Sequence, residues 1–104
     1  MDLIEMNFRQ AKQQAAQLEE LAARLENLAK QDLQETMQEL SGVWKGENAE
    51  AYMRKGNRLE ENIAATAANL KQIASTIRTT AQRTYETEMR AREIAAERTY
   101  SGGH

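Results

Sequence analysis

The absence of proline constrains this chain more than any other feature of its sequence. None of the 104 residues is proline. Because proline interrupts helices and makes up about 5% of an ordinary chain, its absence favours a chain that is helical almost throughout. Glycine, the other helix breaker, occurs five times, at Gly42, Gly46, Gly56, Gly102 and Gly103. Helix-forming residues fill the two long segments between these sites. We therefore predict an all-α fold.

The composition excludes several classes of chemistry. With no cysteine and one histidine, His104, the chain has no means to build a disulfide framework, a thiol nucleophile or a histidine-based site. We therefore expect no catalytic, metal or cofactor-binding residues and no enzyme activity. A net charge of −2 argues against nucleic acid as a partner. A mean hydropathy of −0.80 argues against stable membrane insertion. The first ten residues lack the pattern of a cleavable signal peptide.

Apolar residues recur in steps of four and three along both segments, which is the pattern of a helix packed along its length. Asp2 and Glu5 resemble a capping box at the start of the first segment. The first stripe consists of Ile4, Phe8, Ala11, Ala15, Leu18, Ala22, Leu25, Ala29, Leu33, Met37 and Leu40. The second consists of Tyr52, Leu59, Ile63, Ala67, Leu70, Ala74, Ile77 and Ala81. These stripes predict helices over about 3–40 and 47–99.

A short connection over residues 41–46 forces the two helices to lie antiparallel, so we predict a single hairpin domain over residues 1–100. If the chain reverses between Val43 and Trp44, a residue i faces about residue 87 minus i. The second helix would then overhang the first from about residue 85. We expect residues 101–104 to form a disordered tail.

A lone hairpin leaves much of its apolar surface in contact with water. The side chains that we expect to stay exposed, and that are candidates for a dimer interface, are Leu21, Leu28, Leu59 and Ile73. A second hairpin would cover them, so a four-helix dimer is predicted. The alternative is a monomeric hairpin of low stability.

The only tryptophan lies in the predicted turn, within the sequence Trp44-Lys45-Gly46. Its simplest interpretation is structural: the indole caps the end of the bundle, and Gly46 avoids a clash or a strained backbone. The residues that follow are Glu47, Asn48, Ala49, Glu50, Ala51 and Tyr52. This WxG turn, near the midpoint of a cysteine-free chain of about 100 residues, resembles the WXG100 family, also called the ESAT-6-like proteins.

The resemblance implies a helical hairpin that forms a homodimer or a heterodimer. It also implies export of the folded dimer from the bacterial cytoplasm by the type VII (ESX) secretion system. In that family a membrane-bound ATPase of the FtsK/SpoIIIE type recognises a signal in the C-terminal tail. Some members escort a larger toxin that has a related N-terminal helical domain. The resemblance therefore implies a secreted substrate or an escort.

The C-terminal part of the second helix carries the candidate signal residues. Tyr85 and Tyr100 both lack the acidic residue at plus four that the actinobacterial signal requires, although Glu88 follows Tyr85 at plus three. A looser pattern fits four residues that share one helical face, namely Met89, Glu93, Ala96 and Tyr100. The alternative is that these turns only keep the helix in solution.

Two other functions remain open from the sequence. Amphipathic helices can act on membranes, but residues 1–42 carry eight acidic and four basic side chains, which disfavours binding to anionic lipid. The chain is alternatively a generic helical adaptor in which the WxG turn has no connection with secretion. Replacing Trp44 by arginine separates these interpretations, because only the secretion hypothesis predicts a loss of export.

Overall fold

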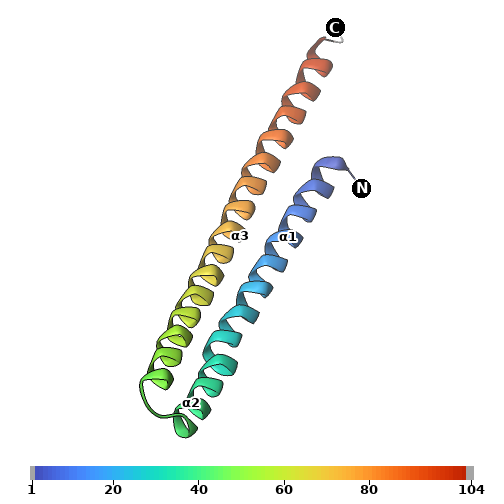
Figure 1. Cartoon of the computed structure of the whole chain (residues 1–104). Helices are drawn as coiled ribbons and strands as arrows, with labels where there is room; N and C mark the ends of the chain where they lie inside the picture. Colours follow the sequence, from blue (N-terminus) through green and yellow to red (C-terminus); the bar gives the residue numbers. More distant parts are fainter. Residues whose placement is uncertain (1, 103–104) are drawn as a thin grey trace. The chain divides into compact units, whose positions relative to one another are not determined.

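The computed structural model of the protein describes the backbone of residues 2–102 and the side chains of residues 2–99 (Figure 1). Its elements are α1 (Leu3–Asn27), the π-helical segment η1 (Leu28–Leu33), α2 (Gln34–Val43) and α3 (Glu47–Gly102). The first three follow one another without interruption, and the chain reverses between α2 and α3 (Figure 1). The described residues contain no strand. The predicted all-α helical hairpin is thus confirmed.

The chain forms two compact units. The terminal unit comprises residues 1–16 and 73–104, and the turn unit comprises residues 17–72. Side-chain contacts join the two helical arms inside each unit, and they show that the arms are antiparallel. In the terminal unit, Asp2 contacts Arg92 and Phe8 contacts Tyr85.

Alanine forms most of the buried core. Ala15 and Ala74 are buried in the terminal unit, and Ala22, Ala29 and Ala67 are buried in the turn unit. Small side chains allow two helix backbones to approach closely, so these positions bring α3 against the other arm. Among the described side chains no large one is fully buried. The helices in each unit are therefore closely packed, but little of the surface of their large apolar side chains is removed from water.

Polar contacts between the arms border this core in the turn unit. Lys71 of α3 forms an ion pair with Glu26 of α1, and its hydrogen bond lowers the pKa of the Glu26 carboxyl. Gln34 of α2 donates from Nε2 to Oε1 of Glu60 over 2.6 Å. Both contacts are exposed or half-buried, so they contribute less to stability than to the alignment of the arms.

Met37 and Gly56 mark a close approach of α2 to α3. The Met37 side chain is buried, and a Cβ atom built on Gly56 would lie 2.6 Å from its Sδ atom. Gly56 therefore leaves the space that the thioether occupies. This glycine lies inside α3 without interrupting the helix.

The first arm departs from the uniform α-helix that was predicted over residues 3–40. It contains the π-helical turn η1, and it continues to Val43, three residues beyond the expected end. The expected turn over residues 41–46 is accordingly reduced to residues 44–46. No proline follows Leu40, and the Trp44 amide still donates to the Leu40 carbonyl over 2.7 Å, so the helical pattern of hydrogen bonds persists to the last turn.

The expected pairing of residue i with residue 87 minus i is wrong by about two helical turns. It placed Phe8 opposite residue 79 and Asp2 opposite residue 85, whereas these residues contact Tyr85 and Arg92. Part of the difference arises because the chain reverses at residues 44–46 rather than between Val43 and Trp44. In the terminal unit, contact with α1 thus extends to Arg92, beyond the position near residue 85 where an overhang was expected.

The end of α3 also differs from the prediction. The helix continues to Gly102, so residues 101–102 lie within the helix rather than in the disordered tail that was expected. Residues 103–104, the remainder of that predicted tail, lie outside the described residues.

Candidate functional site

The WxG turn is built by one extended residue and one glycine with positive φ. Trp44 leaves the helix with φ −92° and ψ 137°, and Gly46 has φ 104°. No heavy atom lies within 4 Å of a Cβ built on Gly46, so a side chain would have room there. Glycine is therefore needed for its backbone conformation, and not to avoid a clash. The Gly46 carbonyl then accepts from the Glu50 amide over 3.1 Å as α3 begins.

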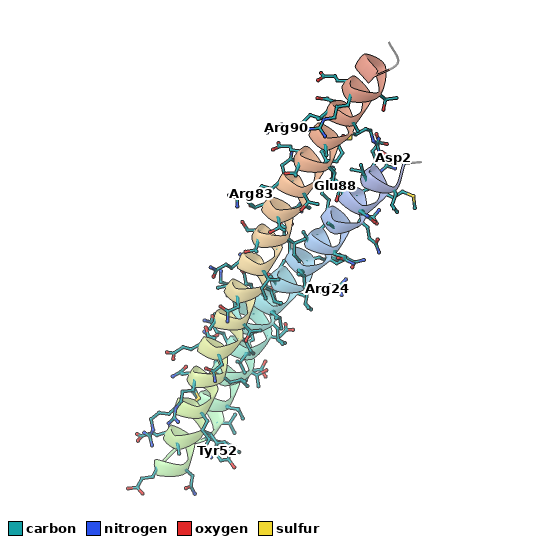
Figure 2. All side chains as sticks on the ribbon, turned by 90° about the horizontal axis from the view of Figure 1, so that it is seen from above. Asp2, Arg24, Tyr52, Arg83, Glu88 and Arg90 are labelled. Atoms are coloured by element: carbon teal, nitrogen blue, oxygen red, sulfur yellow. The ribbon has the colours of Figure 1, made fainter. Side chains whose placement is uncertain are left out.

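The turn presents an aromatic pair that is partly exposed to solvent. The rings of Trp44 and Tyr52 meet edge to face, with centroids 5.2 Å apart. Lys55 Nζ lies 5.8 Å from the centroid of Tyr52, which Figure 2 shows close to the start of α3. The indole remains 44% exposed, and the neighbouring Val43 side chain is 79% exposed. Trp44 thus packs against Tyr52 of its own hairpin and leaves an apolar surface at the turn.

Each candidate for the dimer interface is exposed, as the amphipathic pattern predicts. In the turn unit, Leu21, Leu28 and Leu59 retain between 44% and 50% of their exposure. Leu28 and Leu59 also border a shallow apolar groove of about 220 Å³ whose other walls include Leu33 and Ile63. Ile73, in the terminal unit, is 50% exposed. These positions supply large apolar side chains that the hairpin itself leaves uncovered.

Tyr85, the first candidate signal residue, packs against α1 in the terminal unit. Its ring stacks on Phe8 with centroids 4.6 Å apart and planes inclined by 24°, and Lys12 Nζ lies 4.6 Å from the centroid of Phe8 on α1. A groove of about 360 Å³ runs beside this stack. Glu88 of α3 and Ile4 of α1 are among the residues that line it.

An ion pair between Asp2 and Arg92 continues this contact along α3. Nη1 and Nη2 of Arg92 donate to the two carboxylate oxygens of Asp2 over 2.7 and 2.8 Å. These hydrogen bonds lower the pKa of the Asp2 carboxyl and raise the pKa of Arg92, and the backbone amides of Leu3 and Ile4 lower the Asp2 pKa further. Figure 2 shows Asp2 at the start of α1, near the turns of α3 that carry Glu88 and Arg90.

The remaining candidate signal residues are more accessible. Met89 is half-buried, between the contacts made by Tyr85 and Arg92. Glu93 and Ala96 are exposed, as is every described side chain from residue 91 to residue 99. The side chain of Tyr100 lies outside the described residues. The structure therefore divides the candidate segment into a part that contacts α1 and a part that does not.

Two residues of this region were not expected to act together. The sequence suggests a helix cap for Asp2 and an i+4 pair with Glu88 for Arg92, whereas in the structure Asp2 and Arg92 form an ion pair with each other. The sequence does contain a hint of this ion pair. An acidic residue at the start of one arm and a basic residue near the end of the other can meet when the arms are antiparallel. Only the correct register places them side by side.

The described residues contain neither a candidate metal cluster nor a helix able to span a membrane. Over residues 2–102 no three His, Cys, Asp or Glu side chains come close enough to hold a metal ion. None of the described helices combines the length and the apolar character needed to cross a membrane.

Comparison with known families identifies the chain. A sequence model described as "WXG100: Proteins of 100 residues with WXG" matches residues 3–89, which include both arms and the WxG turn. No curated protein and no solved structure matches the chain. The match covers most of the 104 residues. The chain therefore belongs to the WXG100, or ESAT-6-like, family, whose members are small secreted helical proteins of the type VII secretion system and are not known enzymes.

Proposed function

We propose that this protein is exported by the type VII secretion system as a four-helix dimer, and that the C-terminal part of α3 carries its export signal. The partner is a second copy or a related helical hairpin. In this role the protein is either a secreted substrate or the escort of a larger toxin that has a related N-terminal helical domain. An ATPase of the FtsK/SpoIIIE type is the proposed receptor.

The observation that carries the dimer is the contrast between the core and the surface. The core consists mostly of alanine, whereas Leu21, Leu28 and Leu59 stay about half exposed in the turn unit. Full burial of a leucine side chain contributes about 1.5–3 kcal/mol relative to leaving it in water. Several exposed leucines on one surface therefore favour association. Side chains of a second hairpin would pack into the groove between Leu28 and Leu59.

A charge on this surface tests the dimer. Leu59→Lys should convert the dimer to a monomer, as measured by sedimentation or light scattering at micromolar concentration. Asn57→Lys is the matched control, because Asn57 is exposed and two residues away on another face of α3. A wild-type protein that is monomeric alone and also with its candidate partners, or equal effects of both substitutions, would exclude the proposed interface.

The proposed export signal is tested separately in bacteria that have a type VII secretion system. A chain that ends at Thr84 should remain in the cells while the full chain reaches the medium. Trp44→Arg should also lose export, because the proposed function requires the WxG turn. Equal export of the full and the shortened chain would show that α3 carries no signal beyond Thr84. Coexpression with a candidate toxin distinguishes a substrate, which leaves alone, from an escort.

A further inference from the structure

The contact between the two ends of the hairpin lies on the residues that we propose as the export signal. Tyr85 stacks on Phe8, and Arg92 forms a bidentate ion pair with Asp2. On the first arm the contacts come from Asp2, immediately before α1, and from Phe8 in its second turn; on α3 they lie seven residues apart. We name these two contacts together the clamp. Residues 85, 89 and 92 follow steps of four and three, so Met89 lies between them on the same face of α3.

The clamp restricts access to one part of the candidate signal only. Tyr85 and Met89 are half-buried, whereas Glu93 and Ala96 are exposed. A receptor that binds one face of α3 would therefore reach Glu93 and Ala96 directly. To reach Tyr85 or Met89 in the same way, it would have to replace the side chains of α1.

We infer that the start of α1 is an autoinhibitory element, which masks the first half of the proposed signal over residues 85–92 until the clamp opens. This inference rests on the proposed function, because it assumes that the receptor binds this part of α3. It adds a regulatory step, in which opening of the clamp limits how fast the signal is recognised.

The contacts of the clamp suit a reversible element. The ion pair is partly solvated, with side-chain exposures of 29% for Asp2 and 49% for Arg92. Lys12 lies on Phe8, so both contacts include a charged group that water can reach. Helix ends with few buried contacts open locally without unfolding the rest of the protein. Loss of one exposed ion pair changes such an opening equilibrium by about twofold to fivefold.

The absence of cysteine allows a direct measurement of masking. Met89→Cys places a single thiol behind the clamp, and Ala96→Cys places one beyond it. The rate of maleimide labelling of the folded full-length chain is then measured with and without Asp2→Asn. We expect Asp2→Asn to raise labelling at position 89 by about twofold to fivefold and to leave position 96 unchanged. Glu61→Gln, which likewise replaces an exposed carboxylate by an amide but does not line the groove at Leu28 and Leu59, is the control and should alter neither rate.

Two results would overturn the clamp itself. One is equal labelling at position 89 with and without Asp2→Asn. The other is a parallel increase at positions 89 and 96, which would indicate general loosening. Because Met89→Cys could itself disturb the packing, amide hydrogen exchange of residues 85–92 is compared between the otherwise unmodified protein and Asp2→Asn. Faster exchange confined to these residues supports the clamp, and unchanged exchange contradicts it.

Export distinguishes the regulatory role from the proposed signal. Asp2→Asn should increase the initial rate of export by about twofold to fivefold relative to Glu61→Gln, and Phe8→Leu should act in the same direction. Unchanged or slower export, combined with loss of export on truncation at Thr84, would overturn autoinhibition and leave the signal intact. Full export of the truncated chain would remove the signal and the inference together, whatever the labelling rates.

Discussion

At the scale of single residues, the two glycines near the turn have opposite requirements. Gly46 has a positive φ of 104°, whereas Gly42 lies in α2. A Cβ atom added to either glycine would have no neighbouring atom within 4 Å, so space does not distinguish them. The difference lies in the backbone alone, which makes the pair a clean test of what the WxG glycine contributes.

Alanine at these positions should therefore change stability in opposite directions. Gly46→Ala should lower the free energy of unfolding by about 1–2 kcal/mol, because alanine is strained at this φ. Gly42→Ala should raise it by about 0.5 kcal/mol, because alanine favours the helix. Urea unfolding followed by circular dichroism measures both values. If Gly46→Ala left the free energy of unfolding unchanged, the turn would be able to relax to a conformation with negative φ.

The ion pair between Asp2 and Arg92 predicts a pH dependence of the same end of the hairpin. The folded pKa of Asp2 is lowered below 3.8, mainly by its hydrogen bonds with Arg92. A group with a lowered pKa stabilises the folded state above its unfolded pKa and loses this effect as the pH falls through the folded value. Glu5 and Tyr85 also interact with Arg92, and their interactions favour its charged form.

The melting temperature of the wild type should accordingly exceed that of Asp2→Asn by a constant amount between about pH 5 and pH 7. The difference should shrink as the pH falls below about 3.8. Asparagine is used because it can still cap a helix, so the comparison isolates the charge. A difference that stays constant down to pH 2 would show that Asp2 acts through something other than its ionised carboxylate.

At the scale of elements, η1 explains how the first arm keeps its buried face turned toward α3. Ala22 and Ala29 are seven residues apart, but Met37, the next buried residue, follows after eight. In an unbroken α-helix a step of eight turns Met37 about 80° away from the alanines. A π-helical turn accommodates one extra residue, so Met37 returns to the packed face and meets Gly56.

Removing one residue from η1 should therefore be tolerated. Deletion of Gln31, which is exposed, changes the step from Ala29 to Met37 to seven residues and should give a continuous α-helix with an unchanged or higher melting temperature. Deletion of Gln17, also exposed, shortens a regular step and should lower the melting temperature strongly. Equal losses from the two deletions would show that η1 does not correct the helical phase.

The same elements show how far the sequence determines the fold. The periodic alanines and leucines predict two long helices and their buried faces, because helical spacing is a local property. Register is not local: it depends on where α2 ends, so pairing at Tyr85 and Arg92 was misplaced by about two turns. The eight-residue step at Met37 is visible in the sequence, but it does not say whether the helix will kink, rotate or form a π turn.

In the candidate site, too, the local features were predictable from the sequence and the features that depend on register were not. Trp44 and Gly46 were identifiable because a lone tryptophan and a glycine interrupt a helical pattern. The exposure of Leu28 and Leu59 followed from amphipathic spacing. The contact of Asp2 with Arg92 was not predictable, since it joins residues 90 positions apart through a register that the sequence leaves open.

At the scale of the whole molecule, the small core leads us to expect that stability depends on the proposed association. Among residues 2–99 the buried side chains are alanines together with Met37, so the hairpin alone has little large apolar area to oppose its conformational entropy. If a second hairpin covers the exposed leucines, folding and dimerisation become one reaction. The melting temperature then depends on protein concentration, because mass action stabilises the associated state.

We therefore expect the melting temperature of the wild type, in the absence of any other partner, to rise by about 3–6 °C for each tenfold increase in protein concentration. Leu59→Lys should melt at a lower temperature that does not change with concentration, and Asn57→Lys should behave as the wild type. Calorimetry or circular dichroism over a hundredfold concentration range measures this. If the melting temperature of the wild type does not change with concentration until a related hairpin is added, the stable assembly is a heterodimer. In that case only the partner supplies the missing apolar contacts.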